Sequence, residues 1–130
     1  MTVYQYIGYD AILNLLRAFE HPKRDIPADV LLLWHILHNE EYALNHNPVH
    51  DVIIIKQIVK RHVNTLEELN ELSATIVRRR FVDNMVFNGR EVAEQLGLTE
   101  RQLRNQQKLA IERLTKIINA EEESFRRTHL

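Results

Sequence analysis

The sequence predicts an all-α protein of about six helices, and three observations support this class. Glycine and proline total only six of the 130 residues, too few for the many turns of a β-sandwich. Apolar residues recur at helical spacing along most of the chain. Hydrophobic residues make up 45% and charged residues 27%, which is typical of a globular protein and sufficient to fill a core.

Two helices are predicted in the first part of the chain. The first spans residues 11–19, where Leu15, Leu16 and other apolar residues follow helical spacing. The two prolines of HPKRDIP then predict a loop. Pro27 suits the first turn of a second helix, which is predicted to run through ADVLLLWHILHNEEYAL and to stop near residues 45–48.

The next two segments also favour helix. The β-branched residues of DVIIIKQIVKRHV are typical of a strand, but its apolar residues repeat at helical spacing as well. Because a single strand would have no partner, we predict a helix. A fourth helix is predicted over about residues 66–82. Asn64 or Thr65 would cap it, since Glu68 follows Thr65 at the spacing of a capping box.

Two further helices are predicted over residues 89–96 and 100–120, with a three-residue turn between them. Gly97 suits the left-handed conformation that ends a helix, and Thr99 can cap the next helix together with Gln102. A helix, a short turn with glycine and a capped helix are typical of a helix-turn-helix. The inward positions are predicted at Val92, Ala93, Leu96, Leu103, Ala110, Leu114 and Ile117. The fold class is therefore an N-terminal helical bundle packed on a C-terminal helix-turn-helix.

Basic charge is concentrated in one block of the chain. Residues 1–77 contain six Lys and Arg against ten Asp and Glu, a net charge of −4. Residues 78–116 contain nine against five, a net charge of +4, and residues 117–130 contain two against three, a net charge of −1. The basic block coincides with the predicted motif, so we expect it to have a different role from the rest of the chain.

The second helix of the motif places polar residues on its outward side. Four of them follow the spacing i, i+3, i+4 and i+7: Arg101, Arg104, Asn105 and Lys108. Arginine and lysine can contact guanine or phosphate, and asparagine can pair with adenine, so residues 100–117 are a candidate recognition helix for DNA. Thr99 would hold the start of this helix, and Arg90 would lie near the DNA backbone.

Residues 76–114 resemble region 4 of bacterial sigma factors and the related sigma-like helix-turn-helix domains. The matched elements are VRRRF, EVAEQLGLT, RQLRN and AIERL, and they cover about a third of the chain. The resemblance implies the fold of this region and a second helix that faces DNA. The two residues after the capping threonine are usually Arg and then Glu in this family, but here they are Glu100 and Arg101. The family's promoter element is therefore not implied, and residues 1–75 do not resemble the promoter-melting region of a complete sigma factor.

These observations divide the chain into three predicted regions: an acidic helical region (1–64), a sigma-region-4-like helix-turn-helix (65–120) and a tail (121–130). The predicted function is that of a DNA-binding transcriptional regulator with double-stranded DNA as its partner. The alternative is a helical protein–protein interaction or adaptor module, such as the N-terminal part of a larger signalling protein. The aromatic residues Tyr4, Tyr6, Tyr9, Trp34 and Tyr42 either pack in the core or form a partner or homodimer surface.

Two other clusters of residues are candidates for a function. His35 and His38 are three residues apart on a predicted helix, a spacing that can bind a metal ion. No third ligand follows at a definite spacing, so we predict no metal site. Arg78, Arg79 and Arg80 are either phosphate contacts or a solvated face, and one helix cannot point three successive residues the same way.

Several classes are excluded or not expected. The chain has no cysteine, which excludes disulfides and cysteine-based metal sites. It has no HExxH, P-loop or GxSxG pattern, so we expect neither an enzyme nor a cofactor. No apolar run is long enough to span a bilayer, and MTVYQYIGYD lacks the features of a secretory signal. We therefore expect a cytoplasmic protein without a membrane contact.

Overall fold

The computed structural model describes residues 5–21, 25–38, 44 and 47–129. In these ranges the chain is helical and contains no strand, which confirms the all-α class. Its helices are α1 (Tyr9–Ala18), α2 (Trp34–Leu37), α3 (Pro48–Leu69), α4 (Glu71–Val77), α5 (Gly89–Leu96) and α6 (Glu100–His129). A 3-10 turn over Val30–Leu32 precedes α2, and a π-helical turn over Arg78–Val82 follows α4.

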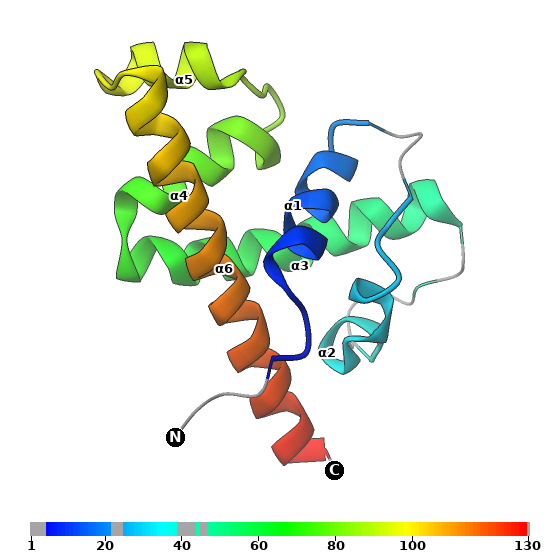
Figure 1. Ribbon diagram of the computed structural model, residues 1–130. Coiled ribbons are helices and arrows are strands. Elements are labelled where there is room, and N and C mark those ends of the chain that lie inside the picture. The colour runs from blue at the N-terminus through cyan, green and yellow to red at the C-terminus, as the bar shows by residue number, and fades with distance from the viewer. Residues whose placement is uncertain (1–4, 22–24, 39–43, 45–46, 130) are drawn as a thin grey trace.

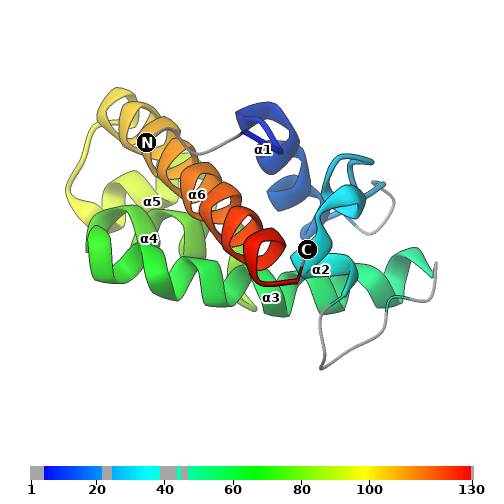
Figure 2. The ribbon, with the colours of Figure 1, turned by 90° about the horizontal axis from the view of Figure 1, so that it is seen from below.

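The long helix α6 organises the molecule, because it contacts each of the other five α-helices. Figures 1 and 2 show α6 crossing α3, with α4 and α5 near its N-terminal half and α1 and α2 further toward its C-terminal end. The elements predicted as an N-terminal bundle therefore pack against the same helix that carries the candidate recognition residues.

The apolar core has two parts. The larger cluster joins residues of α1, α3, α4 and α6 with the turns beside them, and it includes Leu16, Ile55 and Leu114. A smaller cluster lies under the helix-turn-helix and consists of Ile76, Val92, Ala93 and Leu103. All seven predicted inward positions of the motif are buried or partly buried, which confirms the orientation of its two helices.

The predicted second helix was wrong in its extent. In place of one helix over residues 28–44, the chain has the turn Val30–Leu32, an extended residue at Leu33 (φ −75°, ψ 119°) and the short helix α2. The break has a tertiary cause. The backbone amide of Trp34 donates to the Glu122 carboxylate (2.6 Å), and the Leu33 side chain is buried in the core. Residues 39–43 and 45–46, over which this helix was predicted to continue and stop, lie outside the described residues.

The helix predicted over DVIIIKQIVKRHV is confirmed, but the predicted helix start at Asn64 or Thr65 was wrong. Helix α3 continues through both residues to Leu69, and the Thr65 hydroxyl donates to the Arg61 carbonyl (3.3 Å) within the helix. Continuation places Leu66 in the core with no exposed surface. The cap lies instead at Asn70, whose side chain accepts from the next helix, α4. The domain boundary predicted between residues 64 and 65 falls inside α3.

The segment over residues 121–130, which the sequence predicts as a frayed helix end or a tail, is part of a continuous helix as far as the structure describes it. Helix α6 continues to His129 without interruption. Two i,i+4 ion pairs support this part of the helix, Glu122 with Arg126 and Glu123 with Arg127, both at 3.1 Å. Glu122 has no exposed surface, so this end of α6 is packed against the protein.

The turn of the helix-turn-helix matches its prediction. Gly97 adopts the left-handed conformation (φ 68°, ψ 30°) after α5. The backbone amide of Gln102 donates to the Thr99 hydroxyl (3.0 Å), and the backbone amide of Thr99 donates to the side-chain oxygen of Gln102 (2.9 Å). A second capping box, which the sequence analysis did not identify, joins Asn88 and Glu91 at the start of α5. Both helices of the motif thus begin at a reciprocal cap.

We expect Gly97→Ala to lower the free energy of unfolding by about 1–2 kcal/mol, because an L-residue is strained in this conformation. No atom lies within 4 Å of the position that the new Cβ would occupy, so the strain would be conformational. The matched control is Gly89→Ala, whose Cβ would meet Leu103 at an ordinary 3.6 Å. The two variants are compared by urea denaturation. Equal losses in both would contradict the assignment of the effect to the left-handed turn.

Candidate nucleic-acid interface

The four candidate recognition residues emerge together from α6. Arg101, Arg104, Asn105 and Lys108 are all exposed, and none of their side chains makes a hydrogen bond or ion pair within the described part of the chain. The buried side chain of Leu103 fixes the rotation of α6, because it directs the opposite face of the helix to solvent. The four polar groups are consequently available to a ligand without breaking an internal contact.

The two supporting residues of the predicted site lie beside this face. Thr99 is exposed and caps α6. Arg90 is exposed on α5, and its Nε lies 3.8 Å from the Glu94 carboxylate. Such an exposed i,i+4 pair contributes little to stability, so Arg90 can exchange Glu94 for another anion at small cost.

A shallow hollow of about 340 Å³ connects the two helices of the motif. Its lining brings Arg90 and Arg104 of the predicted site together with Arg80 from the π-helical turn. Glu100 also lines the hollow and dilutes its positive charge. The hollow is therefore a cationic depression with one carboxylate at the start of α6.

The arginine triplet is used inside the protein. Arg78 bonds two polar side chains of α3, Arg79 bonds Gln95 of α5 (3.2 Å) and Arg80 bonds Gln107 of α6 (3.0 Å). Arg80 also donates to a backbone carbonyl of the turn before α5, and burial lowers the pKa of its guanidinium. The triplet thus joins the π-helical turn to three helices, a role that the sequence analysis missed.

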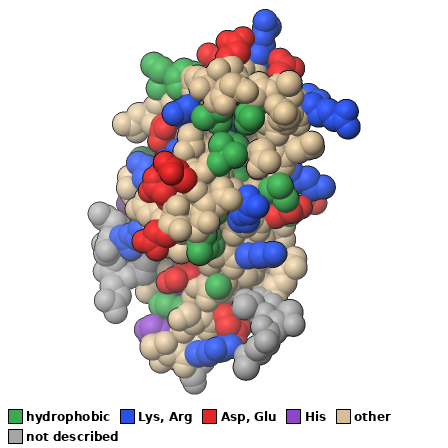
Figure 3. Space-filling model, turned by 90° about the vertical axis from the view of Figure 1, so that its left-hand side faces the viewer, with side chains coloured by type: hydrophobic (Ala, Val, Ile, Leu, Met, Phe, Trp, Pro, Cys, Tyr) green, Lys and Arg blue, Asp and Glu red, His purple; other side chains and the backbone are tan. Residues whose placement is uncertain are grey.

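Acidic groups interrupt the basic surface. On the face shown in Figure 3, Lys and Arg side chains lie among Asp and Glu side chains and do not form a continuous strip. Glu100 stands directly before Arg101 and is exposed like it. Glu100 is one of the five acidic residues that reduce the nine positive charges of residues 78–116 to a net charge of +4, and it weakens the positive field beside Arg101.

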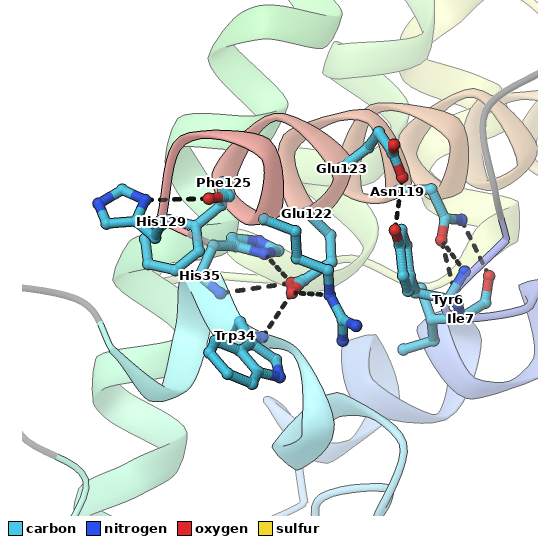
Figure 4. Close-up of polar contacts among 10 residues, drawn as sticks. Tyr6, Ile7, Trp34, His35, Asn119, Glu122, Glu123, Phe125 and His129 are labelled. Carbon is cyan, nitrogen blue, oxygen red and sulfur yellow. Dashed lines mark hydrogen bonds and ion pairs between the residues drawn. The ribbon is translucent and has the colours of Figure 1, made fainter.

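A buried polar cluster, which the sequence analysis also missed, lies at the other end of α6. We call it the Glu122 cluster, and it consists of Trp34, His35, His62, Glu122 and Arg126. The Glu122 carboxylate accepts from the amides of Trp34 (2.6 Å) and His35 (3.3 Å), from His35 Nδ1 (2.7 Å) and from Arg126 Nε (3.1 Å). Figure 4 shows this carboxylate between α6 and the start of α2. Burial raises the pKa of Glu122, but these hydrogen bonds together hold it below its ordinary value.

The N-terminal segment joins α6 next to this cluster. The Asn119 side chain accepts from the amides of Tyr6 (2.6 Å) and Ile7 (3.0 Å), and it donates to the Ile7 carbonyl (2.9 Å). The Arg126 guanidinium lies over the Tyr6 ring (4.3 Å) and near the Trp34 ring (5.7 Å). These two aromatic residues thus make contacts inside the protein, whereas Tyr4 and Tyr42 lie outside the described residues.

The predicted histidine pair is divided between different environments. His35 is buried and bonds Glu122, whereas His38 is exposed and its ring contacts Trp34 at 5.2 Å between centroids. Within the described ranges, no three His, Asp or Glu side chains gather where they could hold a metal ion. No helix of the described part is long and apolar enough to cross a membrane.

Comparison of the chain with protein-family models, with curated proteins and with solved structures gave no match. The functional proposal below therefore depends on the residues and geometry of the helix-turn-helix.

Proposed function

We propose that the protein binds double-stranded DNA through the N-terminal half of α6 and acts as a transcriptional regulator. The observation that supports this most directly is the alignment of Arg101, Arg104, Asn105 and Lys108 on one exposed face, where their side chains have no hydrogen-bond or ion-pair partner among the described residues. Their chemistry suits base edges and phosphates in a major groove. The capped start of α6 and the left-handed turn before it hold this face in the orientation typical of a recognition helix.

The charge distribution favours modest affinity. Glu94 and Glu100 lie beside the basic residues, so a single copy neutralises few phosphates. Proteins with this motif commonly bind as dimers, in which two recognition helices contact successive half-sites. We therefore propose that tight binding requires a second copy or a further partner.

Fluorescence anisotropy with a pool of random duplex DNA tests the proposal. We expect dissociation constants of about 10⁻⁴ to 10⁻⁶ M at physiological salt, and we expect them to rise steeply with salt as counterions are released. Circular dichroism on the same samples confirms that the helices are folded. Absence of binding at low salt, with the helices intact, would overturn the DNA proposal.

Arg104→Ala provides the residue-level test. If Arg104 contacts a base, its loss should weaken binding by about 1–3 kcal/mol and relax the preference at one base pair. Stability should change little, because the Arg104 side chain is exposed and makes no hydrogen bond or ion pair with the residues that the structure describes. The control is Arg127→Ala, which removes the same charge from the distant end of α6. An equal loss from both variants would show that only net charge matters and would contradict a local recognition site.

A second candidate function is protein binding by the same face. Leu109 lies on α6 after the recognition residues and is 41% exposed, and the exposed Glu100 lies among the basic residues of the same helix. Exposed apolar residues among mixed charges are typical of protein interfaces. A photo-crosslinking residue at position 109 would separate the two functions. Crosslinks to protein that random duplex DNA does not reduce would favour the interaction module.

A further inference from the structure

We propose that the Glu122 cluster is an acid-sensitive switch, which releases α2 and the N-terminal segment from α6 when His62 takes up a proton. This inference goes beyond DNA binding and does not depend on it. It starts from a cluster whose one carboxylate already accepts four hydrogen bonds. Among the described residues, two buried ring nitrogens beside it, His35 Nε2 and His62 Nδ1, have no hydrogen-bond partner.

The first step is the distribution of hydrogen bonds. Glu122 provides the only carboxylate of the cluster, and its two oxygens already accept from four donors. One of these donors is the imidazole of His35, which therefore has an anionic partner. For His62, the buried Nδ1 makes no hydrogen bond in the described structure.

The second step is the position of His62 itself. Its side chain is 5% exposed, and its ring lies 5.2 Å from the His35 ring at an interplanar angle of 86°. The charged or titratable groups that act on it are His35 from α2 and Arg61 from its own helix, and the carboxylate of the cluster, Glu122 of α6, already bonds His35 and Arg126. A protonated His62 would therefore be a buried cation near the positive charge of Arg61, and within the described structure its Nδ1 has no acceptor for a new N–H.

The direction of the pH effect follows from this environment. Burial, with contributions from His35 and Arg61, lowers the pKa of His62 to about 3, from an ordinary value of 6.5. The unfolded or released form binds a proton below pH 6.5, and the packed form does not. The packed form is therefore fully stable above this pH, and it loses up to about tenfold in relative population per pH unit as the pH falls toward 3. Glu122, whose pKa is also lowered, adds to the loss once the pH falls below its ordinary value of 4.5.

The third step is why release would be local. Helix α2 has only four residues, and the Glu122 carboxylate binds the amides at its start. Residues 6 and 7 are tied to α6 through Asn119, next to the cluster. The smaller core cluster under the helix-turn-helix contains no histidine and no buried carboxylate. As the pH falls, the contacts around the C-terminal half of α6 would thus be lost before the packing of α5 is affected.

An acid titration of the full chain tests the switch. Trp34 is the only tryptophan and belongs to the Glu122 cluster, so its fluorescence reports on the packing of this cluster. Circular dichroism at helical wavelengths reports on the helix content of the whole protein. We expect the Trp34 signal to change at higher pH than the loss of helix. In His62→Leu the Trp34 transition should move down by about one pH unit or more. His21→Leu, an exposed histidine change outside the Glu122 cluster, should leave it in place.

Coincident transitions that His62→Leu does not move would overturn the proposal. If His62→Leu fails to fold, NMR of the His62 ring in the unchanged protein decides the question. A ring that stays neutral until the Trp34 signal changes supports the switch. A ring that gains its proton near the ordinary histidine pKa while Trp34 stays unchanged overturns it.

Discussion

Replacing Glu122 by alanine is expected to lower the free energy of unfolding by about 3–5 kcal/mol, the typical cost of removing one partner from a buried charged network. The carboxylate has no exposed surface and accepts four hydrogen bonds. Its loss would leave the amides of Trp34 and His35, the His35 ring and Arg126 without their acceptor. Urea denaturation, followed by circular dichroism and by Trp34 fluorescence, measures the loss.

Glu121→Ala is the matched control for this experiment. Glu121 precedes Glu122 on α6, has the same side chain and is exposed, so its removal should change stability by no more than about 0.5 kcal/mol. Glu122→Gln preserves the shape of the side chain, and its loss of stability should lie between those of Glu122→Ala and Glu121→Ala, because an amide oxygen accepts hydrogen bonds more weakly than a carboxylate. A Glu122→Ala variant as stable as Glu121→Ala would contradict the structural role of the cluster.

Leu103→Ala should have the second large effect, a loss of about 2–5 kcal/mol in the free energy of unfolding. Leu103 is 1% exposed and belongs to the small core cluster that joins α5 to α6. This cluster has few members, so the cavity would weaken a large part of the contact between the two helices of the motif. Urea denaturation measures the total loss, and amide hydrogen exchange should show it concentrated in α5.

Leu109→Ala removes the same side-chain atoms from the same helix and serves as the control. Leu109 is 41% exposed, so we expect a much smaller loss of stability. A comparable loss in both variants would contradict the assignment of Leu103 to the core. If the amides of α5 exchange their hydrogens as slowly in Leu103→Ala as in the unchanged protein, the dependence of α5 on this cluster would be contradicted.

The helix-turn-helix could be predicted from sequence because its signals are local. Gly97 ends one helix through its own backbone conformation, and Thr99 and Gln102 cap the next across three residues. The exposure of Arg101 and Arg104 also follows from the position of Leu103 on the same helix. Their binding to DNA remains a prediction, because exposure and charge do not by themselves identify a partner.

The errors arose where distant residues overrode local patterns. Glu122 lies 88 residues after Trp34, and no local pattern could show that its carboxylate would break the second helix at Leu33. Thr65 and Glu68 have the spacing of a capping box, but no helix begins there, because burial of Leu66 favours continuation of α3. One available signal was overlooked, since the i,i+4 pair of Glu122 and Arg126 in the supposed tail is typical of a continuing helix.

Helix α6 also has a mechanical consequence. At a rise of about 1.5 Å per residue, the 18 positions between Arg104 and Glu122 correspond to about 27 Å of straight helix. The candidate recognition face and the buried polar cluster are thus two ends of one rigid rod, with no hinge or loop between them. A tilt of about 5° about one end would displace the other by about 2 Å over this length. That shift is large compared with the precision of a hydrogen bond to a base edge, so the fit of α6 in a groove would depend on how firmly its far end is anchored.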